Sequence, residues 1–432
     1  AVATETLEVV VAGPAQAAQA AAEKLLPALP SMVFVDWANP ELPPVQLYQA
    51  VMSGANPVGA VGAHGMGGTG KTLSCLLTAH RVATEVAGKE RFPDGVCWFQ
   101  LYRDVTRAEV HQRLCALATT LGGSLVEAVD LDMAVERLRT ALVGKSCLLV
   151  VDDVWHVQWV SLFIKAMEGN ESSALLVSTR QRAVASSRRM SRCVEVGALG
   201  GTAATGVLLV HAERSGVVQA DKTDERVGQA VDLCDGLALA LSVMGGLVLA
   251  HGWASALMQV GRQRAALLLE EPTGTDKYAS LWACLLASYA ALGEDEGNCE
   301  LWRERFRALC VLRSKEQLPW SALAALWDED SLDVTKEIAQ TLRNYSLVSV
   351  QDKGPNEPLL LSLHDLVVEF LARPKLLSQT ERSKFHAQLV AGYCRRSGVV
   401  PIEKPVENIS VSTARPAPAA AAPAIWERRR SI

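Results

Sequence analysis

The sequence predicts an α/β protein: a parallel sheet, then a helical domain, then a small module of helices and a β-hairpin. Three observations predict this class. A glycine-rich loop near residue 65 stands between an apolar run and a helical pattern, and further apolar runs ending in polar side chains recur up to residue 196. From residue 200 onward the apolar spacing is helical. At 432 residues the chain exceeds one compact core. We expect an N-terminal helix and linker (1–56), a phosphate-binding domain (57–199), a helical domain (200–275), a hairpin-containing domain (276–397) and a tail (398–432).

The composition is that of a globular protein, with 49% hydrophobic and 21% charged residues. A net charge of −5 gives no general attraction to nucleic acid, so nucleic acid is not an expected partner. The 10 cysteines are scattered without C-x-x-C spacing, which indicates reduced thiols and a cytoplasmic location. The most apolar stretch, 236–253, is interrupted by glycines and is interpreted as a buried helix, so no membrane partner is expected.

The first 56 residues contain no specific motif. Residues 15–29 are rich in alanine and favour a helix that ends at Pro30. Residues 30–56 hold several prolines around Phe34, Trp37 and Tyr48, which predicts an extended segment followed by a short helix. This segment could lie across the base of a ligand held by the loop that follows, or it could pack for stability alone.

Residues 65–72 read Gly-Met-Gly-Gly-Thr-Gly-Lys-Thr and fit the phosphate-binding pattern G-x-x-x-x-G-K-[ST]. An apolar run, 57–63, comes before them and a helical pattern, 73–87, comes after, which is the required strand, loop and helix context. Glycines let backbone N–H groups approach a polyanion closely, and the helix directs its positive end at the anion. The expected nucleotide contacts are Gly65, Met66, Gly67, Gly68, Thr69, Gly70, Lys71 and Thr72. Lys71 would reach the β and γ phosphates, and the Thr72 hydroxyl would bind Mg²⁺.

The next apolar runs predict further strands of the same sheet. A turn at 91–95 leads into a short strand at 96–101, and helical patterns follow at 106–121 and 130–143. Residues 147–151 are uniformly apolar and end in Asp152 and Asp153. The carboxyl ends of parallel strands are where α/β folds bind ligands. We therefore expect Asp152 to hold Mg²⁺, directly or through water, and Asp153 to orient or deprotonate a water molecule. The alternative for such a pair is a turn or a helix cap.

A fourth strand, 174–179, is followed directly by Arg180. An arginine at the carboxyl end of a strand can sense a γ-phosphate, and we favour that role over a surface charge, although four further arginines follow within 12 residues. Residues 193–196 are expected to complete the sheet.

Beyond residue 200 the pattern predicts helices and one hairpin. The expected helices are 201–213, 222–234, 237–250, 254–269, 278–291, 299–310, 320–328, 332–344 and 379–395. Two short strands, 347–350 and 359–361, with a turn at 352–355, complete a winged-helix pattern. The proline- and alanine-rich residues 398–432 predict disorder, and the basic triplet at 428–430 is interpreted as a solvated end.

In this order, these landmarks resemble the NB-ARC family of STAND-class P-loop ATPases, which includes plant disease-resistance proteins and apoptotic protease-activating factors. The resemblance covers roughly residues 57–395. It rests on the phosphate loop (65–72), the second nucleotide motif (148–155), the threonine-arginine sensor strand (176–180), Cys-Asp-Gly-Leu-Ala-Leu-Ala-Leu (234–241) and Leu-His-Asp-Leu (363–366).

The resemblance implies a switch that holds ADP in a closed state and opens on exchange for ATP, with self-association and slow hydrolysis of ATP to ADP and phosphate. It implies that Leu237 and Ala238 lie at the adenine, that His364 contacts the β-phosphate, and that Asp365 supports the closed state. Ala238 replaces the usual proline, and the usual G-R-E entry motif is absent, with residues 33–37 in its expected place.

Three classes of function remain open from the sequence. The first is the ATP/ADP-binding switch, whose effector and sensor functions would reside in other domains or proteins. The second is a turnover ATPase or P-loop kinase with Lys71, Asp153 and Arg180 as catalytic residues. The third is a nucleotide-controlled DNA-binding regulator, which the winged-helix pattern suggests, although the candidate recognition helix at 319–326 has no basic residue.

Overall fold

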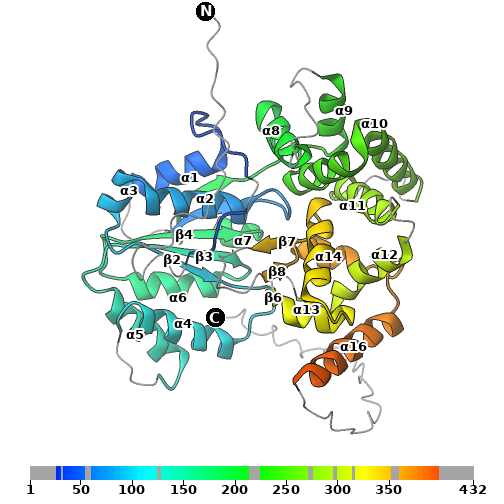
Figure 1. The fold of residues 1–432 in the computed structure, drawn as a ribbon. Helices are drawn as coiled ribbons and strands as arrows, with labels where there is room; N and C mark the ends of the chain where they lie inside the picture. The colour runs from blue at the N-terminus through cyan, green and yellow to red at the C-terminus, as the bar shows by residue number, and fades with distance from the viewer. Residues whose placement is uncertain are drawn as a thin grey trace, which may run out of the picture.

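The computed structural model describes residues 26–30, 33–53, 60–123, 128–213, 224–270, 276–294, 299–313, 317–351 and 360–397. The described residues form an α/β domain and a second, helical body, residues 201–397 (Figure 1). The expected run at 57–59, the turn at 352–355, the N-terminal residues 1–25 and the tail at 398–432 lie outside the described residues.

The α/β domain is built on a parallel sheet of five strands in the order β2-β3-β4-β1-β5. The strands are β1 (Ala60–His64), β2 (Val96–Gln100), β3 (Leu148–Val154), β4 (Ala174–Thr179) and β5 (Met190–Glu195). The helices are α1 (Pro43–Met52), α2 (Lys71–Thr84), α3 (Val86–Arg91), α4 (Arg107–Thr120), α5 (Leu131–Leu142), α6 (Val157–Met167) and α7 (Arg182–Ala185). This arrangement confirms the predicted α/β class.

Helices cover both faces of the sheet, which explains the unbroken apolar runs in its strands. Along β3, Leu148 and Val150 pack with α1 and α2, whereas Leu149 and Val151 pack with α4, α5 and α6 on the opposite face. Figure 1 shows the two helical layers above and below the sheet.

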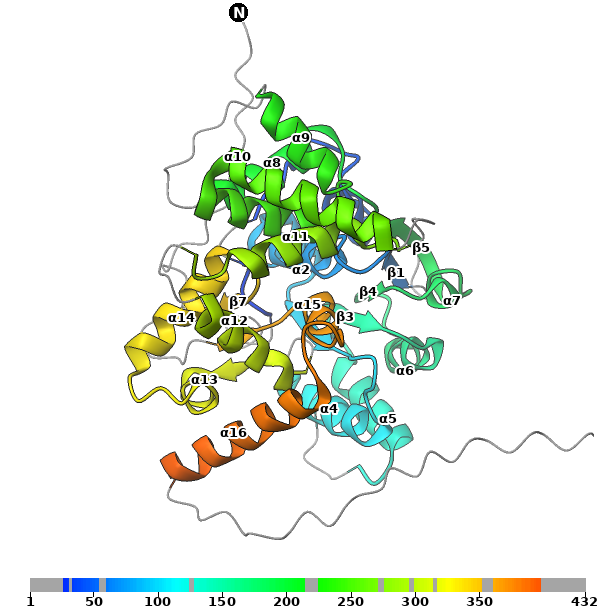
Figure 2. The ribbon, with the colours of Figure 1, turned by 90° about the vertical axis from the view of Figure 1, so that its right-hand side faces the viewer.

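The helical body begins with α8 (Gly201–Ala212), α9 (Glu225–Leu233), α10 (Ala238–Glu270) and α11 (Ala279–Ala291). It continues with α12 (Cys299–Ala308), the 3₁₀ turn η2 (Leu309–Val311), β6 (Leu318–Pro319), α13 (Trp320–Trp327), α14 (Leu332–Asn344), β7 (Ser349–Gln351), β8 (Leu360–Ser362), α15 (Asp365–Leu371) and α16 (Gln379–Ser397). Strands β6, β8 and β7 form a small antiparallel sheet beside α13 and α14, as a winged-helix pattern requires (Figure 1). Figure 2 shows β7 next to α14 from another side.

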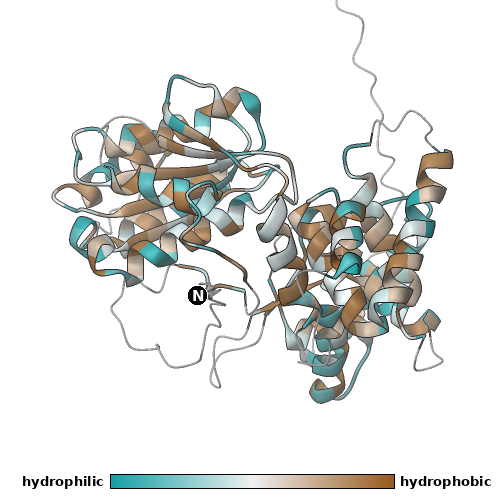
Figure 3. Cartoon of the chain, turned by 90° about the horizontal axis from the view of Figure 1, so that it is seen from above, coloured by the Kyte–Doolittle hydropathy of each residue, from teal (hydrophilic) through white to brown (hydrophobic). Residues whose placement is uncertain are grey.

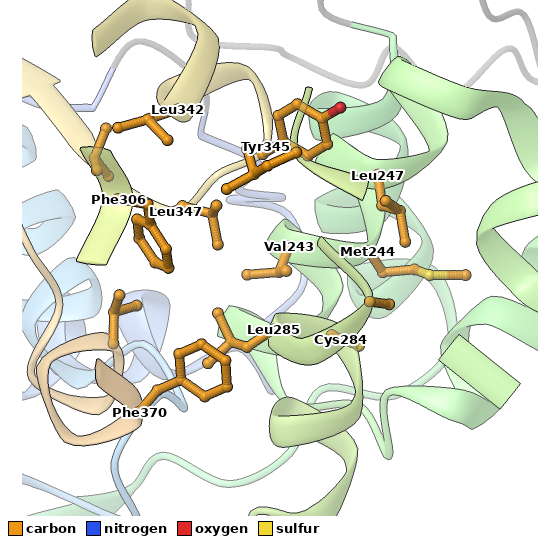
Figure 4. Packing of buried hydrophobic residues seen from close by; sticks show 14 of the residues in the cluster. Val243, Met244, Leu247, Cys284, Leu285, Phe306, Leu342, Tyr345, Leu347 and Phe370 are labelled. Carbon is orange, nitrogen blue, oxygen red and sulfur yellow. The ribbon is translucent and has the colours of Figure 1, made fainter. Parts of the chain in front are cut away.

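One hydrophobic core runs through the whole helical body. It extends from Ala204 in α8 to Phe385 in α16 and crosses the expected boundary at 275/276. Figure 4 shows Val243 of α10 and Leu285 of α11 in the same cluster as side chains of α12, α14 and α15. The α/β domain has separate cores of its own, and the two bodies lie side by side (Figure 3). The expected helical and winged-helix segments therefore pack as one unit.

Several elements differ from the sequence-based expectation. The helices expected at 237–250 and 254–269 are the two halves of α10, which breaks at Gly252 (φ 75°, ψ 167°). Strand β5 begins three residues earlier than expected. Helices α3, α6, α7 and α15 and the short strand β6 were not predicted.

Among the described residues, α10 is the one helix whose length and apolar composition would suffice to cross a membrane. Half of its apolar window is buried inside the protein. Together with the break at Gly252, this burial accounts for α10 as a core helix.

Candidate functional site

The phosphate loop, residues 65–72, connects β1 to α2 at the carboxyl edge of the sheet. Gly68 (φ 75°) and Gly70 (φ 95°) adopt left-handed conformations that favour glycine. A Cβ on Gly65 would lie 2.1 Å from the carbonyl oxygen of Val196. The glycines therefore fit a loop that bends tightly and packs closely against the end of β5.

Lys71 begins α2, and its side chain is buried. Its ammonium donates to the carbonyl oxygen of Met66 at the start of the loop. Burial and, after it, the nearby charge of Arg180 lower the pKa of Lys71 to about 8, although Asp365, Asp153 and Asp152 act in the opposite direction. A buried ammonium at the start of the helix that follows the loop is suited to receive phosphate oxygens.

Thr72 and Asp152 meet at the end of β3. The Thr72 hydroxyl donates to Oδ1 of Asp152 over 2.9 Å, and Asp152 is fully buried. Its carboxylate also accepts from the Ser178 hydroxyl and, over 3.4 Å, from Nε2 of Gln100. Mg²⁺ is commonly bound through one or two carboxylates, phosphates and water, so a hydroxyl and a carboxylate this close fit that ion. Among the described residues, no group of three or more His, Cys, Asp or Glu side chains forms a protein-only metal site.

Asp153 and Arg180 lie at the ends of neighbouring strands. The register between β3 and β4 shifts between Val151 and Val154, so that Asp153 adopts a positive φ of 60°. Its backbone N–H donates to the Ser178 hydroxyl over 2.8 Å. Nε of Arg180 lies 3.9 Å from Oδ1 of Asp153. The register shift thus turns a second carboxylate towards Arg180, whose role as a phosphate sensor stays a prediction.

The segment around Leu237 and Ala238 lies against the phosphate loop. Gly236 (φ 65°) makes the turn that starts α10, and a Cβ on it would lie 2.2 Å from the carbonyl oxygen of Leu199. The Leu239 N–H donates to the carbonyl oxygen of Gly68 over 3.0 Å. Ala238 Cβ is 3.9 Å from the position that a Cβ on Gly70 would take. The structure therefore brings this segment to the loop.

His364 caps the first turn of α15. Its Nδ1 accepts from the Leu366 N–H over 3.1 Å and lies 2.8 Å from Oδ1 of Asp365. Asp365 forms an ion pair with Arg180, and a methyl group of Leu366 lies 3.2 Å from the position that a Cβ on Gly68 would take. The start of α15 therefore lies on the loop, while the contact of His364 with a nucleotide stays a prediction.

Tyr278 is a site residue that the sequence did not indicate. Its hydroxyl oxygen accepts from the Gly67 N–H over 3.1 Å, although the two residues are 211 positions apart. Ser178 and Gln100 were also not predicted, but both are polar residues at or near the carboxyl ends of strands, which is a usable signal. Tyr278 has no such signal, because only the packing of the helical body brings it to the loop.

The segment at 33–37 joins the two bodies. Val33 and Val35 form a small buried cluster with Leu77 of α2. The Phe34 ring lies against Gly206 of α8, where a Cβ would be 2.5 Å from the ring. The segment therefore packs against both α2 and α8, while a contact with the base of a ligand stays a prediction.

Residues 45–205 match the family described as the NB-ARC domain. Disease resistance RPP13-like protein 4 of Arabidopsis thaliana is 22% identical over 321 residues, which cover 70% of this chain and 36% of the relative. Disease resistance protein Pik-2 of Oryza sativa subsp. japonica is 24% identical over 264 residues, covering 57% of this chain and 25% of the relative. The chain thus matches about a third and a quarter of these relatives' lengths.

A solved structure shares the fold. The Signal Transduction ATPase with Numerous Domains (STAND) protein with a tetratricopeptide repeat sensor from Pyrococcus horikoshii aligns with a TM-score of 0.51 at 13% identity. The alignment covers 88% of this chain and 47% of that protein.

Proposed function

We propose that this chain, which carries an NB-ARC domain over residues 45–205, is an ATP/ADP-binding signalling switch. The NB-ARC match supports nucleotide binding, and the similarity to plant disease resistance proteins supports a signalling role. In our proposal, ADP is held in a closed state, and exchange for ATP opens the molecule and permits self-association. A cytoplasmic location is also proposed, supported by the ten cysteines, none of which forms a disulfide in the described part of the chain.

The observation that carries this proposal is the contact between the helical body and the phosphate loop. Tyr278 binds the Gly67 amide, Leu366 packs near Gly68, and Asp365 pairs with Arg180. A ligand can shift a conformational equilibrium only if it interacts differently with the two states. Because helical-body residues contact groups expected to bind phosphate, a nucleotide at this loop can bias the arrangement of the two bodies.

The residues have separate tasks in this proposal. Lys71 and the loop amides hold the phosphates, and Thr72 and Asp152 hold Mg²⁺, which would neutralise phosphate charge. Arg180 exchanges Asp365 for the γ-phosphate when ATP binds. Asp153 orients or deprotonates the attacking water. We expect slow hydrolysis, as the family resemblance implies.

The identity and fate of the nucleotide test this function. Purified protein is expected to carry ADP, which denaturation followed by chromatography would identify, and to hydrolyse ATP far below the median enzyme turnover of about 10 s⁻¹. Lys71→Ala is expected to lose bound nucleotide, because it removes the cation that faces the phosphates.

Lys145→Ala provides the control, since Lys145 lies away from the loop and pairs with Asp94 over 3.6 Å. It should retain nucleotide as the unaltered protein does. Normal ADP retention by Lys71→Ala would remove the phosphate-loop assignment. Sustained rapid ATP turnover by the unaltered protein would favour a turnover enzyme over a switch.

A further inference from the structure

The Tyr278 hydroxyl accepts a hydrogen bond from a backbone N–H of the phosphate loop. It accepts the Gly67 N–H over 3.1 Å, and a Cβ on Gly67 would lie 2.9 Å from the same oxygen. Nη1 of Arg180 would lie 2.6 Å from that Cβ on the same side of the loop. An amide has one hydrogen to donate, so a phosphate oxygen and this hydroxyl compete for it.

The Gly67 amide is the loop amide that we infer to lie nearest to a γ-phosphate. The lysine of this motif reaches the β and γ phosphates, and the Lys71 ammonium lies at the carbonyl oxygen of Met66, the residue next to Gly67. The expected γ-phosphate sensor, Arg180, also approaches Gly67. Two independent cations thus mark this amide as the neighbour of the terminal phosphate, which ATP has and ADP lacks.

Tyr278 is held firmly in this position. Oδ1 of Asp276 accepts the Tyr278 N–H over 2.9 Å, and Oδ2 accepts the indole N–H of Trp282 over 2.8 Å. The rings of Tyr278 and Trp282 contact edge to face at 5.8 Å, and Trp282 stacks on Phe370 of α15 at 6.3 Å. Arg373 lies over Trp282 at 4.1 Å. Displacing the phenol from the loop therefore disturbs packing between α11 and α15.

We propose that Tyr278 discriminates between ATP and ADP. Its hydroxyl occupies the Gly67 amide in the closed state, ADP leaves that contact intact, and a γ-phosphate must displace it. This hydrogen bond thus lowers the affinity for ATP relative to ADP. Its loss couples binding of the terminal phosphate to movement of α11. This inference rests on the proposed nucleotide switch and adds a residue that determines its nucleotide preference.

Tyr278→Phe tests the proposal, because it removes only the hydroxyl. Dissociation constants for ADP and for a slowly hydrolysed ATP analogue would be measured with Mg²⁺ on the whole 432-residue chain after its nucleotide has been removed. We expect the affinity ratio to move towards the ATP analogue by about fivefold, the contribution of one neutral hydrogen bond. Tyr289→Phe is the matched control, since Tyr289 lies on α11 and packs against Phe306 and Phe370; its ratio should stay unchanged.

The outcomes separate this inference from the proposed function. If the unaltered chain binds both nucleotides and Tyr278→Phe leaves their ratio unchanged or moves it towards ADP, the role of Tyr278 is overturned and the switch stands. If the unaltered chain binds neither nucleotide, the proposed function itself fails.

A second pair of variants keeps the test decisive if Tyr278→Phe folds poorly. Asp276→Ala removes the acceptor that positions Tyr278, whereas Asp276→Asn keeps one carbonyl oxygen there. We expect Asp276→Ala to move the ratio towards the ATP analogue and Asp276→Asn to restore it at least in part. Equal ratios for these two variants and the unaltered chain would contradict the positioning of Tyr278 through Asp276.

Discussion

At the scale of single residues, burial and neighbouring charges around the phosphate loop set the protonation of Lys71. Lys71 and Arg180 lie near Asp152, Asp153 and Asp365, yet burial and the arginine outweigh these carboxylates and lower the pKa of Lys71 to about 8. A bound polyphosphate would add negative charge beside the ammonium and raise this pKa. Nucleotide binding is therefore coupled to the protonation of Lys71.

This coupling predicts that nucleotide affinity falls at alkaline pH. Below about pH 8 the free protein holds the Lys71 proton, and above it the proton must be taken up on binding. We expect the dissociation constant for ADP to rise by about tenfold per pH unit above that value, until the pKa of the bound state is reached. Calorimetry in two buffers with different ionisation enthalpies would count the protons.

The control for this titration is Lys145→Ala, which should show the same slope as the unaltered protein. A flat affinity between about pH 8 and 9.5, without proton uptake, would show that Lys71 stays charged in the free protein.

Sequence reasoning predicts candidate site residues where a local motif has the spacing that the chemistry requires. Lys71, Thr72 and Asp152 belong to motifs whose spacing reflects contact with phosphate and metal, and the structure brings Thr72 and Asp152 within 2.9 Å. Tyr278 could not be predicted, because a single tyrosine before a helix has no distinguishing pattern. Its contact depends on tertiary packing across 211 residues.

At the scale of elements, α10 packs closely against two neighbours through a pair of glycines. A Cβ on Gly245 would lie 2.6 Å from the His211 Cβ of α8. A Cβ on Gly246 would lie 2.6 Å from the carbonyl oxygen of Asn344 and 2.7 Å from the backbone carbon of Tyr345. Since these last contacts are backbone atoms, the end of α14 would have to move to accommodate any side chain at Gly246.

Two alanine substitutions in α10 should therefore have opposite effects on stability. Gly246→Ala gains about 1 kcal/mol of helix propensity but overpacks a buried contact, which costs about 1–3 kcal/mol. Gly261→Ala gains the same propensity with nothing within 4 Å of its Cβ. We expect a lower urea midpoint for Gly246→Ala and a higher one for Gly261→Ala, followed by tryptophan fluorescence.

Equal midpoints for the two variants would contradict the close approach of α14 to α10. A rise for both would mean that propensity dominates and that the α14 end yields without cost.

The elements that sequence reasoning missed lack start signals. Helix α6 has no side-chain cap and no acidic residue in its first turn, so its apolar residues did not stand out as a helix after Asp152 and Asp153. Helix α15 has seven residues and is capped by His364 rather than by one of the preferred capping residues. Strand β6 has two residues. The short elements α15 and β6 form because the surrounding core stabilises them, and a local sequence pattern does not contain that information.

At the scale of the whole molecule, the α/β class was predictable because the buried strands and the loop motif are local features. The single core of the helical body was not, since the expected boundary at 275/276 divides helices α10 and α11 that pack in one cluster. The single core has a consequence for how the two bodies separate. If the helical body moves as one unit, the loop contacts of α10, α11 and α15 break together.

A charge substitution at the contact between α15 and Arg180 should shift the whole molecule towards the open state. Asp365→Asn removes the charge that pairs with Arg180, where both side chains are mostly buried. A hydrogen bond to a charged group contributes about 1.5–3 kcal/mol, so the equilibrium should shift towards the open state by about tenfold to hundredfold. We expect faster ADP dissociation and a larger radius of gyration by small-angle X-ray scattering.

Asp328→Asn is the matched control for this substitution. Asp328 pairs with Arg395 over 2.5 Å, but both side chains are exposed and lie within the helical body, where such a pair contributes at most about 1 kcal/mol. Asn tolerates its left-handed backbone (φ 55°). The control should keep the ADP dissociation rate and radius of the unaltered chain. If Asp365→Asn behaved like Asp328→Asn, the closed arrangement would not depend on the Arg180 pair, and the remaining loop contacts, led by Tyr278 and Leu239, would have to hold the bodies together.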